Sequence, residues 1–99
     1  MTYTPKESTQ YRLIAAAHAK HAMTQSPLLF PWRTSVSLEV HFFRDSNRKC
    51  DLDNLLKNIL DGLTTAKLWL DDSQVVSIEA TKNIDRSNPR AEITVTLEP

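Results

Sequence analysis

The spacing of leucine side chains in the middle of the chain is the feature that most restricts its fold. Apolar residues recur at intervals of three and four between positions 52 and 63: Leu52, Leu55, Leu56, Ile59, Leu60 and Leu63. This spacing places them along one side of an α-helix. Because such a stripe has to be buried against another layer, the segment predicts a helix packed on a sheet or on a second helix.

The remaining segments supply a second helix and three strands. The alanine-rich run 11–23 favours a helix, with a capping box formed by Thr4 and Glu7 and an end at Pro27. Apolar and polar residues alternate over 36–42, 76–80 and 91–97, which is typical of strands with one buried face. The predicted order is helix, strand, helix, strand, strand. The expected fold is α+β, with two helices on one face of a short mixed sheet.

Composition limits the class of protein. The 99 residues fit one domain, 1–99, and the single cysteine excludes an internal disulfide. The single glycine excludes a glycine-rich phosphate-binding loop, and no apolar run is long enough to span a bilayer. The amino-terminal residues lack the apolar core of a signal peptide, so a cytoplasmic location is expected. The net charge of zero argues weakly against nucleic-acid binding, because local patches matter more than the sum.

Acidic residues stand on both sides of the leucine-rich helix. Asp51 and Asp53 precede it, and their side chains converge if residues 51–53 are extended. Lys57 lies four residues after Asp53, on the same face of the helix. Asp71 and Asp72 precede the next strand. One of these two can join the first pair if that strand starts beside the start of the helix.

Three clustered carboxylates have a chemical implication. Two like charges about 4 Å apart repel by about 4 kcal/mol at an effective dielectric constant near 20. A divalent cation is the usual compensation, and oxygen ligands select Mg²⁺ or Mn²⁺. Such an ion binds phosphate groups and activates water for phosphodiester hydrolysis, while a nearby lysine neutralises charge on the phosphate.

Other interpretations of the same residues remain open. Asp53 can cap a helix that begins at Asn54 or Leu55, and Lys57 can belong to an ion-pair stripe with Asp53 and Asp61. The basic residues Arg44, Arg48 and Lys49 are either a solvated loop or a positive approach for phosphates to the acids that follow.

A longer pattern resembles a known family. The segment 51–82, DLDNLLKNILDGLTTAKLWLDDSQVVSIEATK, is similar to the core motif of the RusA family of Holliday junction resolvases. The matching positions are Asp51, Asp53, Asn54, Lys57, Asp61, Leu63, Trp69, Asp71, Asp72, Val75 and Lys82. The resemblance extends over roughly residues 4–97.

The resemblance implies a Mg²⁺-dependent homodimeric endonuclease that cuts four-way DNA junctions symmetrically. Asp51, Asp53 and Asp72 match the metal-binding catalytic acids, Lys57 matches the catalytic lysine, and Asp71 matches a supporting acid. The expected DNA contacts come from four basic side chains: Arg44, Arg48, Lys49 and Lys82.

One departure leaves an alternative open. Members of that family usually begin with a further strand and a basic loop, whereas this chain opens almost at its first predicted helix. A shortened relative that binds junctions but cuts them poorly is therefore the second hypothesis. A phosphatase of the D-x-D class is disfavoured because Asp51 follows a hydrophilic loop instead of a buried strand. A glycosyltransferase needs a larger nucleotide-binding domain than this chain can form.

Overall fold

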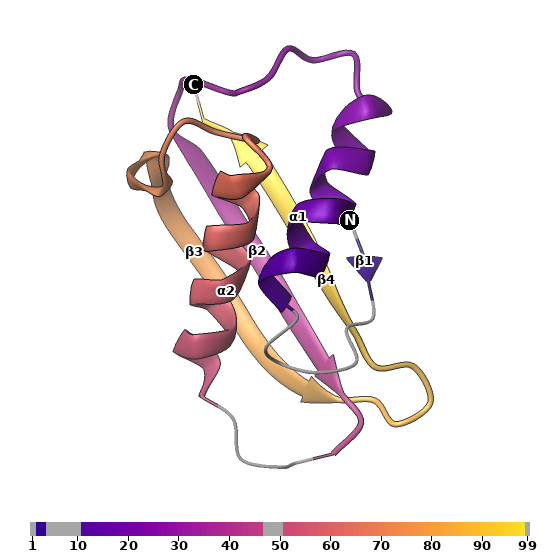
Figure 1. Cartoon of the computed structure of the whole chain (residues 1–99). Helices are drawn as coiled ribbons and strands as arrows, with labels where there is room; N and C mark the ends of the chain where they lie inside the picture. Colours follow the sequence, from indigo (N-terminus) through magenta and orange to yellow (C-terminus); the bar gives the residue numbers. More distant parts are fainter. Residues whose placement is uncertain (1, 4–10, 47–50, 99) are drawn as a thin grey trace.

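The computed structural model describes residues 2–3, 11–46 and 51–98. These residues form two helices, four strands and one short 3-10 helix (Figure 1): β1 (Thr2–Tyr3), α1 (Tyr11–Thr24), β2 (Val36–Arg44), α2 (Leu52–Thr65), η2 (Asp72–Gln74), β3 (Val75–Ile84) and β4 (Arg90–Leu97). The α+β class and the predicted order of the five main elements are confirmed. The two-residue β1 was not predicted, and the predicted start of the first helix at Thr4 lies outside the described residues.

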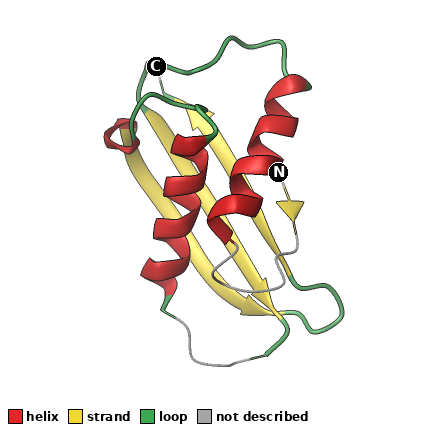
Figure 2. Ribbon diagram, viewed as in Figure 1, coloured by secondary structure: helices red, strands yellow, loops and turns green. Residues whose placement is uncertain are grey.

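The strands form one mixed sheet in the order β1-β4-β2-β3. β2 pairs antiparallel with β4 and parallel with β3, and β1 pairs antiparallel with β4. Parallel neighbours require a crossover connection, and α2 provides it. Both helices lie on the same face of the sheet (Figure 2). In the described part of the chain no helix covers the other face.

The predicted apolar positions of β2 are buried beneath the helices, whereas those of α2 divide into buried residues and the partly buried Leu52, Leu56 and Leu60. Val36, Leu38, Val40 and Phe42 have at most 2% of their surface exposed, and the helix contributes Leu55, Ile59 and Leu63. Each fully buried side chain of this size contributes about 1.5–3 kcal/mol through the hydrophobic effect. The alternating apolar residues predicted in β3 are less buried than those of β2, because β3 lies at the edge of the sheet. Its Val76 and Ile78 side chains are 62% and 44% exposed.

The two helices cross closely at Gly62, the only glycine of the chain. A Cβ atom at this position would lie 2.6 Å from the Arg12 carbonyl oxygen and 3.0 Å from the Ala15 Cβ. The facing surface of α1 is built from the small residues Ala15, Ala16 and Ala19, all of them buried. The alanine-rich sequence therefore lets α1 approach α2 as well as favouring helix formation. Among the described residues, no helix is long and apolar enough to cross a membrane.

Candidate metal centre and nucleic-acid interface

Asp51 is the N-cap residue of α2, immediately before the helix begins at Leu52. Its backbone is extended, with φ −76° and ψ 130°, and its carbonyl oxygen accepts the first helical hydrogen bond from the Leu55 N–H at 3.2 Å. Its carboxylate makes no capping hydrogen bond to the described residues of the helix. The exposed Asp51 carboxylate is therefore not committed to capping, although it occupies the N-cap position.

Asp53 lies inside the first turn of α2. Its Oδ1 accepts a hydrogen bond from the backbone N–H of Asn54 at 3.0 Å. The helix begins at Leu52, so the alternative that Asp53 caps a helix starting at Asn54 or Leu55 is wrong. The assumption that residues 51–53 are all extended fails for the same reason. Both carboxylates still lie at the amino-terminal end of α2, where the helix dipole favours negative charge.

Lys57 lies one turn further along α2 and is exposed. In the described part of the chain it forms no ion pair with Asp53 or Asp61, and the ion pairs there involve other residues. The simple ion-pair stripe is therefore not formed. The Lys57 ammonium group is available to an anion near the start of the helix.

Asp71 has a clear structural role at the other acidic site. Its carboxylate accepts a hydrogen bond from the Ser73 backbone N–H at 3.1 Å, which caps η2. Hydrogen bonding to Ser73 lowers the pKa of the Asp71 carboxyl group, because these bonds stabilise its ionised form. Asp72 follows as the first residue of η2 and is exposed.

Gln74 is a positioning residue that the sequence analysis missed. Its Oε1 accepts hydrogen bonds from the backbone N–H groups of Leu70 and Asp71 at 2.9 and 3.0 Å. Its Nε2 donates to the carbonyl oxygens of Trp32 and Thr34 at 3.0 and 2.9 Å. Gln74 therefore ties the segment that carries Asp72 to the loop before β2. The spacing of an acid and a glutamine three residues later is the capping-box signal that could have identified it.

The two acidic pairs lie at opposite ends of α2. Asp51 and Asp53 are at its start, whereas η2 follows its end, and Figure 1 shows α2 and β3 running in opposite directions between these points. A helix of 14 residues is about 21 Å long, which no aspartate side chain can bridge. Within the described residues, no group of three or more His, Cys, Asp or Glu side chains is placed to hold a metal ion. A single chain therefore brings Asp51 and Asp53 to one end of α2 but not Asp72.

Basic side chains lie at the same end as Asp51 and Asp53. Arg44 ends β2, and Lys82 pairs with Phe42 near the end of β3. Since Phe42 faces the helices, strand alternation places Lys82 and Arg44 on the helix-covered face. Arg48 and Lys49 lie outside the described residues.

The face of the sheet that no described helix covers carries acidic side chains. It carries Glu39, Glu79 and Glu92, and Glu39 lies directly beside Glu79 on the neighbouring strand. His41 lies among them, with its Nε2 3.5 Å from a Glu39 carboxylate oxygen. The uncovered face therefore carries negative side chains, whereas Arg44 and Lys82 place positive charge on the helix-covered face.

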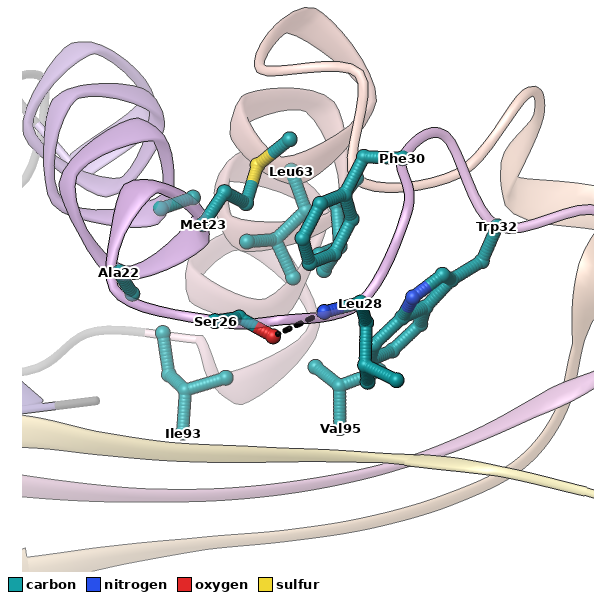
Figure 3. A pocket seen from close by; sticks show the side chains of 11 residues that line it. Ala22, Met23, Ser26, Leu28, Phe30, Trp32, Leu63, Ile93 and Val95 are labelled. Carbon is teal, nitrogen blue, oxygen red and sulfur yellow. Dashed lines mark hydrogen bonds between the residues drawn. The ribbon is translucent and has the colours of Figure 1, made fainter.

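A cavity of about 240 Å³ lies away from these acids, between the end of α1, the loop before β2 and the sheet. Figure 3 shows that its walls are mainly apolar: Ala19, Ala22, Met23, Ser26, Leu28, Phe30, Trp32, Leu63, Leu68, Ile93 and Val95. The Leu28 backbone N–H donates to Ser26 Oγ at 3.2 Å. Because no carboxylate lines this cavity, its chemistry does not suit a hydrated divalent cation.

Comparison with known proteins gives one consistent result. The sequence profile of the family described as endodeoxyribonuclease RusA matches residues 1–96. The crossover junction endodeoxyribonuclease RusA of Escherichia coli K12 is 37% identical over 95 residues, which cover 96% of this chain and 76% of that protein. The proteins of the same name from Shigella sonnei and Enterobacteria phage 82 are each 36% identical over 95 residues, with the same coverage. This chain therefore belongs to the RusA endodeoxyribonuclease family.

Proposed function

We propose that this protein is a divalent-metal-dependent endonuclease that resolves four-way DNA junctions as a homodimer. The observation that carries the proposal is the pair of exposed carboxylates, Asp51 and Asp53, at the start of α2 in a chain of the RusA family. Its relatives are named as crossover junction endodeoxyribonucleases. The chain acts on branched DNA in the cytoplasm.

The donor set at the start of α2 suits Mg²⁺, with Mn²⁺ as a substitute. Mg²⁺ in proteins is commonly held by one or two carboxylates, together with water and substrate phosphates. Asp51 and Asp53 supply two such carboxylates, and Asp72 is the third ligand proposed from the family motif. When bound there, such an ion would supply Lewis-acid chemistry for phosphodiester hydrolysis.

The other residues bind and orient the DNA. Lys57 offsets the negative charge that develops on the phosphate, since its side chain has no acidic partner in the described part of α2. Arg44 and Lys82, with Arg48 and Lys49 of the preceding loop, contact the phosphate backbone. Asp71 acts indirectly, because its cap on η2 fixes the backbone beside Asp72.

A junction-binding protein that cuts poorly is the second candidate. It is favoured by the distance between Asp72 and the other two acids within one chain. Such a protein would keep the basic end of the sheet and bind branched DNA without hydrolysing it.

Cleavage of a synthetic four-way junction separates the two candidates. The protein is incubated with the junction or with the matching linear duplex, in the presence of Mg²⁺, Mn²⁺ or a chelator. Symmetric, metal-dependent nicks in the junction alone are the expected result. Binding of the junction without any nicks would instead establish the second candidate.

A further inference from the structure

We propose that the turn between β3 and β4 is a preformed DNA-binding arm, in which Asp85 and Arg90 hold the backbone and Arg86 binds a phosphate of the DNA. The inference rests on the proposed function for the identity of the ligand, which is DNA. It adds an element of the fold, and residues to which the proposed function gives no role.

The turn lies at the end of the sheet that carries Asp51 and Asp53. β3 ends at Ile84, which pairs with Arg44 at the end of β2. The backbone N–H of Asp85 then donates to the Arg44 carbonyl oxygen at 2.8 Å. Figure 1 shows the connection between β3 and β4 at the same end of the sheet as the start of α2. DNA that approaches the acids therefore also approaches this turn.

The Asp85 carboxylate orders the turn from within. Its Oδ1 accepts hydrogen bonds from the Ser87 backbone N–H at 3.2 Å, the Ser87 hydroxyl at 2.8 Å and the Asn88 backbone N–H at 3.3 Å. Hydrogen bonds from Ser87 and Arg90 lower the pKa of the Asp85 carboxyl group, because they stabilise its ionised form. At neutral pH the turn is therefore held by a charged acceptor.

Arg90 fixes the turn to the sheet. Its Nη1 donates to the other Asp85 carboxylate oxygen at 2.9 Å and to the Asn88 carbonyl oxygen at 2.8 Å, and its Nε donates to Glu92 at 3.3 Å. The guanidinium carbon also lies 3.9 Å from the centre of the Phe43 ring, in a cation–π contact. Because these contacts engage the Arg90 charge within the protein, Arg90 is a positioning residue.

Arg86 is the charged residue of the turn that remains available. Asp85 and Arg90 neutralise each other, whereas Arg86 is exposed and takes part in no ion pair among the described residues. An ordered backbone lowers the entropy lost when such a side chain binds its ligand. A guanidinium group can bind two phosphate oxygens at once. The turn thus presents an arginine for a phosphate contact at the end of the sheet where Arg44 and Lys82 also lie.

The phosphate contact is tested by the salt dependence of junction binding, measured by gel-shift titration over a series of salt concentrations. Arg86→Gln is expected to make the plot of log affinity against log salt less steep by about 0.9, the value for one lost phosphate contact. Arg33→Gln is the matched control, because Arg33 is exposed on the loop before β2, at the opposite end of the sheet, and its slope should equal the wild-type slope. An unchanged slope for Arg86→Gln would overturn the inference.

The positioning role of Asp85 is tested by a change for which the two explanations predict opposite signs. Asp85→Ala removes a negative charge, which strengthens DNA binding if the turn is only a solvated loop. In the proposed arm the same change releases the turn, so binding weakens and the slope falls as it does for Arg86→Gln. Asp85→Asn keeps an oxygen acceptor for the Ser87 and Asn88 N–H groups, and it is expected to recover part of the affinity. Unchanged or stronger binding by Asp85→Ala would overturn the positioning role.

A double variant shows whether Asp85 acts through Arg86. Once the turn is released, removal of the Arg86 charge has little further effect, so Asp85→Ala with Arg86→Gln should bind almost as well as Asp85→Ala alone. Full additivity of the two losses would overturn the coupling.

These measurements separate the arm from the nuclease. A protein that shows the expected slopes but cuts no junction would contradict only the proposed function. Normal cutting with an unchanged Arg86→Gln slope would contradict only the arm, and a wild-type protein that binds no DNA would overturn both.

Discussion

At the scale of single residues, the close helix crossing depends on one missing methyl group. A Cβ atom at Gly62 would lie 2.6 Å from the Arg12 carbonyl oxygen, and a backbone atom cannot move aside as a flexible side chain would. Gly62→Ala is therefore expected to lower the free energy of unfolding by about 1–3 kcal/mol, and the Tm by roughly 5–20 °C. Thermal unfolding measures this loss. Thr65→Ala, at an exposed position on the same helix, serves as the control and should leave the Tm nearly unchanged.

Asp53 is expected to contribute to cleavage but not to binding. Asp53→Asn removes a metal ligand and one negative charge, so junction binding is retained or slightly strengthened. Losing about 4 kcal/mol of metal-dependent stabilisation lowers the cleavage rate about a thousandfold, since each 1.4 kcal/mol is tenfold. Single-turnover cleavage and gel-shift titration measure the two effects separately. Cutting at a near-normal rate would contradict the assignment of Asp53.

Asp71 is expected to stabilise the fold in a pH-dependent manner. Its pKa is lowered in the folded protein, so its contribution is present above the ordinary value of 3.8 and is lost as the pH falls through the folded pKa. Asp71→Ala should therefore destabilise the protein near neutral pH and have little effect in stronger acid. Urea unfolding of both proteins near neutral pH and below the folded pKa of Asp71 measures the difference in the free energy of unfolding. Asp72→Ala is the control, since the Asp72 side chain takes no part in the capping box.

At the scale of secondary-structure elements, the helices and strands that have a clear periodic pattern of apolar residues could be predicted from the sequence. The three-and-four spacing of the leucines identified α2, and the alternation of apolar residues identified the buried face of β2. The relative positions of the acids depend on a non-local property, the parallel pairing of β2 with β3. No local pattern encodes that pairing, so whether Asp72 would reach Asp51 and Asp53 could not be decided from spacing alone. The start of α2 was left open for a local reason. Asp51 and Asp53 are both suitable N-cap residues, and the helix begins at Leu52, two or three residues before the alternative starts at Asn54 and Leu55.

The basic loop between β2 and α2 carries its own prediction. Arg48→Glu with Lys49→Glu is expected to weaken junction binding and to flatten its dependence on salt, because each lost phosphate contact reduces the slope by about 0.9. Affinity measured over a series of salt concentrations gives the slope. Reversing the charge of Lys20, an exposed residue on α1, is the comparison variant. An unchanged slope for the double variant would show that the loop does not touch DNA.

At the scale of the whole molecule, metal binding and dimer formation should be linked. In the proposed homodimer, with Asp72 as the third proposed metal ligand, three carboxylates would share one site, and their mutual repulsion would oppose assembly until a divalent cation offset it. Mg²⁺ is therefore expected to lower the Kd of the dimer, as any ligand that binds only the associated state must. Sedimentation equilibrium with Mg²⁺ and with a chelator measures the shift. Asp72→Asn should reduce the response to Mg²⁺, and an equal response in both proteins would contradict the proposed role of Asp72 as a metal ligand.

The separation of the acids along α2 has a consequence for how the activity scales with the amount of protein. Within one chain, Asp72 lies at the opposite end of the 14-residue helix from Asp51 and Asp53. The helix is about 21 Å long, so neither end holds all three acids. In the proposed function the homodimer is the form that cuts, and below its Kd the number of dimers would rise with the square of the protein concentration. Dilution alone would then restrain the proposed activity, with no inhibitor needed. Cutting would be confined to places where two chains accumulate, and the branched DNA proposed as substrate would provide such a place by binding both copies.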